Sequence, residues 1–226
     1  MYTEIKYLYL KQHSVTNGMT DAQLLEMANL VKVKNVKKGE SIYMEDGFES
    51  RIYLLSKGKV KISEVDDRGD ELIKEILTAT DIFGDVSLNG TTSDDEFAEA
   101  LTENTVICSF KSSEFKQLMQ ANVVLAINFI QHVSSKFRNL ENRHSNLVFK
   151  DAKSRLISFF RDWAQREGRK EGDKIKLNNY LTHNDIAGII STSRQSVTTL
   201  LNELKDGGMI YYNRKHIEFS DRALVN

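Results

Sequence analysis

The chain has 226 residues, of which 40% are hydrophobic and 28% charged, and its formal net charge is −1. This composition excludes a disordered or low-complexity protein, and no apolar run approaches the roughly 18 residues that span a bilayer. The first residues lack the basic-then-apolar pattern of a signal peptide. We therefore expect a cytoplasmic protein of one large domain or two modest ones, with no membrane partner.

Cysteine and histidine usage argues against a metal centre. Cys108 is the single cysteine, which excludes an intrachain disulfide and any cysteine-only zinc or iron–sulfur site. The five histidines are scattered and form no His-x-His or His-Glu-x-x-His pair. The sequence thus predicts neither a metal nor a cofactor.

Charge is spread unevenly along the chain. Residues 151–226 carry 13 Lys+Arg and 10 Asp+Glu, whereas residues 1–150 carry 18 and 22. Residues 1–150 are therefore acidic and residues 151–226 mildly basic. The basic charge of the C-terminal part favours a polyanion as its partner.

The N-terminal half reads as a helix followed by short strands. Thr20 and Gln23 have the spacing of a capping box at the start of the helix. From about residue 33 to 111, glycines separate short apolar or alternating runs, which is typical of an all-β sandwich or barrel. Cys108 falls on the last predicted strand, where a buried core thiol is favoured over a redox sensor.

Residues 113–150 read as helical, with a short helix at 114–119 before a long one. In the long helix, apolar residues recur at alternating spacings of three and four residues, which is the a/d pattern of a coiled-coil seam. A homodimer is favoured, with His144 as a polar residue that sets the register. The alternative is a helix packed on its own domain through Leu125, Ile127 and Phe129. The predicted seam consists of Val123, Ala126, Ile130, Val133, Phe137, Leu140, His144 and Leu147.

A further amphipathic helix at 156–164 leads into a loop rich in glycine and charge at 166–174, and a helix-turn-helix pattern follows at 182–204. Thr182 and Asp185 predict a cap on the first helix, and Ser193 predicts a cap on the second. The second helix has an apolar stripe on one face at Val197, Leu200, Leu201 and Leu204.

The opposite face of the second helix presents Arg194, Gln195, Thr198 and Thr199. Arg can donate two hydrogen bonds to guanine O6 and N7, and Gln can pair with adenine N6 and N7. The helix N-termini, at Thr182, His183 and Ser193, offer N–H groups to phosphate oxygens. The pattern predicts a recognition helix in the major groove of double-stranded DNA.

Alternating residues at 209–212 and 216–219 flank Asn213, Arg214 and Lys215 and predict a β-hairpin wing. The cations at its tip, Lys215 among them, are placed to contact backbone phosphates. Ser191 stands in the tight turn between the two helices, where a left-handed backbone would cost a non-glycine residue about 1 kcal/mol. A three-helix module that binds protein instead of DNA is the alternative.

These motifs together resemble the cAMP receptor protein/fumarate–nitrate reductase regulator (Crp/Fnr) family over nearly the whole chain. The resemblance is densest at 38–40, 53–62, 81–85, 146–149 and 192–201. It implies an α+β fold with an N-terminal β jelly roll of the cyclic-nucleotide-binding type, a long dimerisation helix and a C-terminal winged helix-turn-helix. The corresponding boundaries are 1–120 for the sensor domain, 121–150 for the dimerisation helix and hinge, and 151–226 for the DNA-binding domain.

The resemblance also locates an effector pocket and argues against cAMP as its ligand. In cyclic-nucleotide binders a Gly-Glu pair and a later Arg-Ser pair hold the ribose and phosphate. Here these positions align with Gly84-Asp85 and Asp94-Asp95, and the base-contacting helix positions align with Leu140 and Glu141. Carboxylates at a phosphate site repel the ligand, so in place of cAMP we expect an anion, a small organic effector, a partner protein or no ligand at all. The departure at Thr199, where the family often has Arg, puts the familiar operator half-site in doubt.

The resemblance implies a homodimeric transcription regulator that binds an inverted-repeat operator and RNA polymerase, and that is not an enzyme. Effector control would act through the hinge at 149–151. An enzyme of the cupin type also uses a jelly roll, but it needs clustered histidines, and residues 14–131 contain none. A regulatory protein-interaction module with a degenerate DNA-binding unit is the other alternative.

Overall fold

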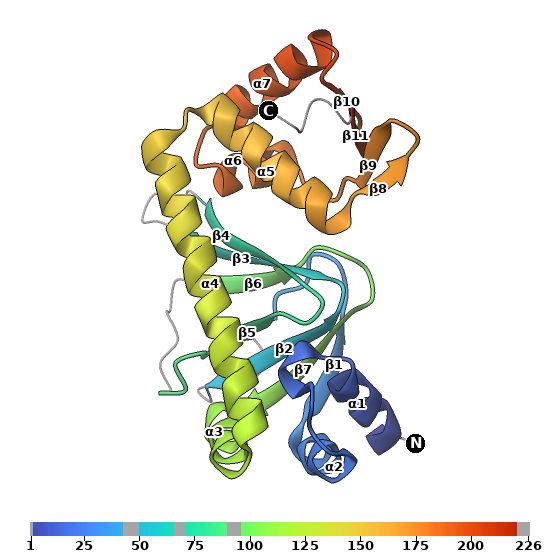
Figure 1. Ribbon diagram of the computed structural model, residues 1–226, viewed down its shortest axis with the longest axis vertical. Coiled ribbons are helices and arrows are strands. Elements are labelled where there is room, and N and C mark those ends of the chain that lie inside the picture. The colour runs from blue at the N-terminus through green and yellow to red at the C-terminus, as the bar shows by residue number, and fades with distance from the viewer. Residues whose placement is uncertain (1, 43–49, 66–70, 90–95, 221–226) are drawn as a thin grey trace. The chain divides into compact units, whose positions relative to one another are not determined.

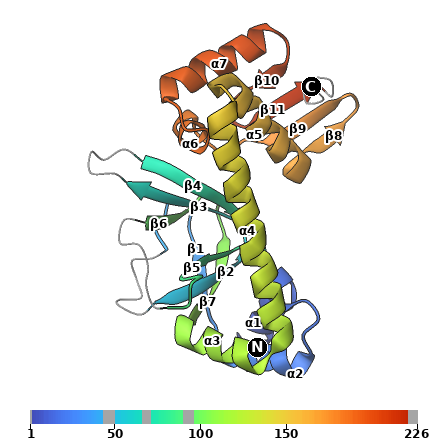
Figure 2. The same ribbon diagram turned by 60° about the vertical axis from the view of Figure 1, so that its left-hand side comes forward.

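The computed structural model describes residues 2–42, 50–65, 71–89 and 96–220. The chain divides into two compact units, Met1–Leu140 and Glu141–Asn226, and the helix α4 (Val123–Phe149) runs through the boundary between them. Figures 1 and 2 show the elements of each unit in two views.

The first unit is a two-sheet jelly roll with two helices before its strands and two after them. All strand pairs are antiparallel, in the sheet orders β1-β7-β2-β5 and β4-β3-β6. The strands are β1 (Lys32–Val36), β2 (Arg51–Lys57), β3 (Lys59–Val65), β4 (Glu71–Thr78), β5 (Ile82–Gly84), β6 (Glu96–Ala100) and β7 (Thr105–Lys111). The helices are α1 (Tyr2–Lys11), α2 (Asp21–Leu30), α3 (Ser112–Ala121) and the first part of α4, with a 3-10 turn at Ser14–Thr16. The predicted β sandwich and jelly roll are confirmed.

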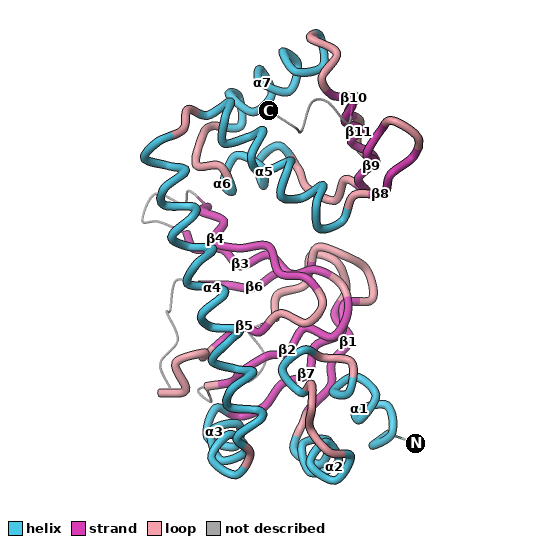
Figure 3. The backbone as a smooth tube through the Cα atoms, in the orientation of Figure 1, coloured by secondary structure: helices cyan, strands magenta, loops and turns pink. Residues whose placement is uncertain are grey.

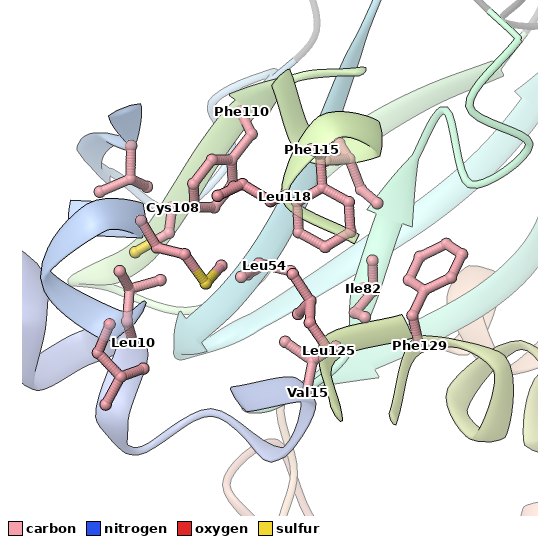
Figure 4. Packing of buried hydrophobic residues seen from close by; sticks show 14 of the residues in the cluster. Leu10, Val15, Leu54, Ile82, Cys108, Phe110, Phe115, Leu118, Leu125 and Phe129 are labelled. Atoms are coloured by element: carbon pink, nitrogen blue, oxygen red, sulfur yellow. The ribbon is translucent and has the colours of Figure 1, made fainter. Parts of the chain in front are cut away.

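Strand β2 is buried on both faces and separates two hydrophobic clusters. Leu54 points with Phe110 and Phe115 into a cluster that the helices cover (Figure 4). Tyr53 and Leu55 point the other way, into a cluster shared with β3, β4 and β6. A strand covered on both sides reads as a continuous apolar run, which explains why its sequence does not alternate.

Helix α4 packs on the jelly roll through one face. Leu125 and Phe129 are buried in the cluster of Figure 4. A polar row four residues apart adds anchors: Asn128 donates to the Val15 carbonyl at 2.9 Å, His132 accepts from the Ile82 amide at 3.1 Å, and Lys136 pairs with Glu75 at 2.8 Å. The alternative that the helix packs on its own domain is therefore confirmed for Leu125 and Phe129 and wrong for Ile127, which is 50% exposed. The predicted seam occupies other positions of the same helix.

The second unit is a winged helix-turn-helix with a four-stranded sheet in the order β10-β11-β9-β8. After α4 come α5 (Ala152–Glu167), β8 (Arg169–Glu171), β9 (Lys174–Asn178), α6 (His183–Ile189), α7 (Arg194–Asp206), β10 (Ile210–Tyr212) and β11 (His216–Ser220). Figure 3 shows these strands and helices by colour. Trp163 and Phe160 of α5 pack against Tyr180 and Phe219 in the core of this unit.

Two elements differ from the sequence prediction. The segment expected to be a loop at 166–174 instead contains β8 and the start of β9, joined by a turn at Gly172 with a φ of 63°. Every residue of β8 is exposed, so no apolar alternation could reveal it. Helix α1, which the sequence analysis did not predict, buries Leu10 against the jelly roll.

Candidate nucleic-acid interface

Each helix of the helix-turn-helix begins at a side-chain cap. Thr182 accepts from the Asp185 amide at 3.1 Å, and Asp185 accepts from the Thr182 amide at 2.8 Å, which completes a capping box on α6. Ser193 accepts from the Ser196 amide at 3.0 Å and caps α7. Both predicted caps are confirmed, and each fixes the entry direction of its helix.

The turn between α6 and α7 is held by a side chain that sequence reasoning missed. Ser191 has a φ of 52°, so the left-handed conformation anticipated for this residue is present. Arg155 of α5 donates to the carbonyls of Ile190 at 2.8 Å and Ser191 at 3.2 Å. It also donates to the carbonyl of Lys150 at 2.7 Å, in the segment that joins α4 to α5. Arg155 thus ties that segment to the turn.

Helix α7 has a buried face and an exposed face. Val197, Leu201 and Leu204 are buried, and they anchor the helix on the core of the second unit. Arg194, Gln195, Thr199 and Ser193 are exposed, and Thr198 is half-buried. The four predicted base-reading residues therefore lie within the first two turns of α7.

The predicted wing is present as the β10–β11 hairpin. At its tip the Asn213 side chain accepts from the amides of Lys215 and His216, each at 2.8 Å. This local turn leaves the side chains of Arg214 and Lys215 exposed. Both cations are available for phosphate contacts.

His183 was predicted among the residues at the helix N-termini, and the structure places its ring between two other elements. Nδ1 lies 2.9 Å from the hydroxyl oxygen of Thr198 in α7, and Nε2 is hydrogen-bonded to the hydroxyl of Tyr212 in β10. Burial, with the nearby charge of Arg194, lowers the pKa of His183 below its usual value. Tyr212 was not singled out from the sequence, because no local pattern links it to His183.

The predicted effector positions are only partly within the described residues. Asp94 and Asp95 lie outside them. Gly84 has a φ of 85°, and a Cβ there would approach the Arg51 carbonyl to 2.5 Å, so this position requires glycine. Asp85 is buried and accepts from the hydroxyls of Ser50 at 2.7 Å and Ser87 at 2.8 Å.

Leu140 and Glu141 are both exposed on α4 and stand at the boundary between the two units. The Asp85 carboxylate is already hydrogen-bonded within the first unit.

The predicted seam runs along the exposed side of α4. Its large apolar members are exposed to 69% at Val123, 61% at Ile130, 60% at Phe137, 61% at Leu140, 47% at Leu147 and 37% at Val133. Ala126 is half-buried and His144 is exposed. A row of exposed apolar residues along one helix is the feature that an interhelical contact would cover.

Among the residues that the structure describes, no helix combines the length and apolar character needed to cross a membrane. No three of the described His, Cys, Asp or Glu side chains gather as metal ligands would.

Comparison with known proteins assigns both halves of the chain. Residues 33–122 match the family described as "Cyclic nucleotide-binding domain", and residues 154–224 match "Crp-like helix-turn-helix domain". The chain is 30% identical over 186 residues to the global nitrogen regulator of Synechocystis sp., which covers 82% of this chain and 83% of that protein. It is 22% identical to the CRP-like cAMP-activated global transcriptional regulator of Mycobacterium tuberculosis, over 94% of each chain.

Solved structures show the same fold. CooA from Carboxydothermus hydrogenoformans superimposes with a TM-score of 0.73 at 24% identity, covering 93% of this chain and 91% of that one. The c-di-GMP-responsive regulator CLP of Xanthomonas campestris superimposes with a TM-score of 0.74 at 13% identity, covering 89% and 100%. With the jelly roll, the long helix and the winged helix-turn-helix in place, the chain belongs to the Crp/Fnr family of transcription regulators.

Proposed function

We propose that this protein is a cytoplasmic, homodimeric, sequence-specific regulator that binds an inverted-repeat operator and recruits or blocks RNA polymerase. The observation that carries the proposal is the first turn of α7, where Arg194 and Gln195 are exposed on a helix whose opposite face is buried. Both side chains can form bidentate hydrogen bonds with purines, Arg with guanine and Gln with adenine. The exposed Lys215 of the wing supplies a phosphate contact that sets the register without reading sequence.

The exposed seam of α4 supports homodimerisation. Val123, Ile130 and Phe137 are spaced seven residues apart, and each exposes more than half of its side chain. Two copies of this helix side by side would cover these rows, and they would place the two recognition helices about 34 Å apart on DNA. We assign residues 1–120 to sensing, 121–150 to dimerisation and the hinge, and 151–226 to DNA binding.

The sensor domain does not respond to cAMP in this proposal. The buried Asp85 carboxylate accepts two hydroxyl hydrogen bonds from its own unit, so its oxygens are less available to a ribose hydroxyl. The sequence has Asp94 and Asp95 where a cyclic phosphate needs a cation and a hydroxyl. A ligand of different chemistry, or a partner protein, fits these residues better than a phosphodiester does.

DNA reading is tested by selecting operators from a random duplex pool and comparing Arg194→Ala with Lys205→Ala. Lys205 is an exposed cation at the other end of the same helix, so the two variants lose the same charge. Arg194→Ala should lose about 1–3 kcal/mol at one base pair of each half-site, and Lys205→Ala should keep the full preference. Equal discrimination by both variants would contradict the role of Arg194. The absence of any salt-dependent binding would favour the protein-interaction module.

Dimerisation is tested by sedimentation of Phe137→Glu beside Asn139→Glu. Both variants add one carboxylate to an exposed position of α4, but only Phe137 lies on the seam. We expect the first to sediment as a monomer and the second as a dimer, because a buried unpaired charge opposes association. A wild-type chain that sediments as a monomer at micromolar concentration overturns this part of the proposal.

A further inference from the structure

One hydrogen-bonded chain links the wing, the first helix and the recognition helix. The ring of His183 in α6 contacts the Tyr212 hydroxyl through Nε2 and the Thr198 hydroxyl through Nδ1, the latter at 2.9 Å. Thr198 in turn donates to the backbone carbonyl of Arg194 at 3.0 Å. This series of hydrogen bonds therefore ends on the backbone of Arg194, the residue proposed to read guanine.

The proton directions in this chain follow from the inventory of each group. A threonine hydroxyl has one proton and two lone pairs, and the proton of Thr198 points to the Arg194 carbonyl. The Nδ1 of His183 must then carry a proton and donate it to the Thr198 oxygen. In the neutral ring the remaining nitrogen, Nε2, is an acceptor, so the Tyr212 hydroxyl donates to it.

The neutral form is the one expected at neutral pH. Burial of the ring and the nearby positive charge of Arg194 both lower the pKa of His183. The tautomer with the proton on Nδ1 is selected by Thr198, whose own proton is on the Arg194 carbonyl, and the Tyr212 hydroxyl, which can donate or accept, then donates to Nε2. The rings of His183 and Tyr212 also pack at 5.4 Å between centroids, which holds the imidazole in place.

We infer that His183 is a positioning residue for base readout, which makes Thr198 an acceptor-only group toward DNA. The Thr198 hydroxyl donates its proton to the Arg194 carbonyl and accepts the proton of His183 Nδ1 with one lone pair. A single lone pair therefore remains for a contact with DNA. In the major groove that lone pair can accept from the amino group of adenine or cytosine, and it repels guanine O6 and thymine O4. The inference rests on the proposed DNA-binding function and adds the specificity of one position to it.

The test compares base preferences of the full-length protein and three variants in operators selected from a random duplex pool. His183→Leu removes the donor to Thr198, and His183→Asn restores a donor, because the Asn amide nitrogen occupies nearly the place of Nδ1. Asn202→Ala is the matched control, since Asn202 is exposed one helical turn after Thr198 on α7 and is not one of the residues proposed to read DNA. Circular dichroism and urea unfolding establish that each variant is folded.

The wild type should prefer adenine or cytosine over guanine or thymine about fivefold or more at one position of each half-site. In His183→Leu this preference should fall to about twofold or less while the preferences at other positions stay. His183→Asn should restore it, and Asn202→Ala should leave it intact. If the base preference is lost in both His183→Leu and His183→Asn, the ring acts only through packing, and the inference is overturned.

A preference that survives His183→Leu overturns the inference as well, and so does a wild-type preference for guanine or thymine at the Thr198 contact. Failure of the proposed function gives a different result. In that case no sequence is enriched by any of the proteins, the wild type included.

Discussion

Replacing Arg155 with methionine should destabilise the second unit without touching its apolar core. The guanidinium of Arg155 donates to three backbone carbonyls, those of Lys150 at 2.7 Å, Ile190 at 2.8 Å and Ser191 at 3.2 Å. A hydrogen bond from a charged donor contributes about 1.5–3 kcal/mol when it is buried. The side chain is half-exposed, and water replaces part of these contacts, so we expect a loss of about 2–4 kcal/mol in the free energy of unfolding.

The second unit has its own optical probe for this measurement. Trp163 is the single tryptophan of the chain and is 1% exposed in the core of that unit. Urea unfolding followed by its fluorescence therefore reports on the unit that contains Arg155. Arg155→Lys should lose less than Arg155→Met, because an ammonium group can retain about one of the three contacts while lacking the fork geometry.

Lys153→Met is the matched control on the same helix. Lys153 pairs with Glu203 at 3.2 Å, but the two side chains are 44% and 50% exposed. An exposed ion pair of this kind contributes about 1 kcal/mol at most. If Arg155→Met costs no more than Lys153→Met, the carbonyl contacts do not hold the turn, and the assignment of Arg155 as the tie between the α4–α5 segment and the turn is refuted.

Three further predictions concern single residues. Ser191→Gly should raise the free energy of unfolding of the second unit by up to about 1 kcal/mol, because glycine relieves the φ of 52°; unchanged or lower stability in the Trp163 assay argues against backbone strain there. Burial lowers the pKa of His13 from 6.5 to about 4. Between these two pH values the ring is therefore neutral in the folded state and protonated in the unfolded chain. Unfolding followed by circular dichroism should therefore show that this group lowers the free energy of unfolding by about 2 kcal/mol between pH 7 and pH 5. The decrease should be absent in His13→Asn, and an equal dependence of the free energy of unfolding on pH in both proteins would refute the prediction. The Cys108 thiol is fully buried, and burial raises its pKa, so a thiolate-specific reagent should label it only when the first unit unfolds, and rapid labelling of the native protein would disprove this.

The sequence determined those features that depend on neighbours a few residues away. Capping residues act over three positions, so the boxes at Thr20 and Thr182 could be read directly and are present in the structure. The apolar stripe of α7 follows helical periodicity, and Val197 and Leu201 are buried as expected. Residue spacing likewise located the long helix and the wing.

Only the tertiary structure decided the contacts between residues distant in the chain. Arg155 and Ser191 lie 36 positions apart, and His183 and Tyr212 lie 29 apart, so no local period marks either pair. Strand β8 is held at the sheet edge by pairing with β9, while its own residues are all exposed and charged, which is why it read as a loop. Hydrogen bonds of this kind depend on where the packed elements place their polar atoms. The sequence pattern reveals which face of a helix or strand is hydrophobic, but it does not reveal the positions of those polar atoms.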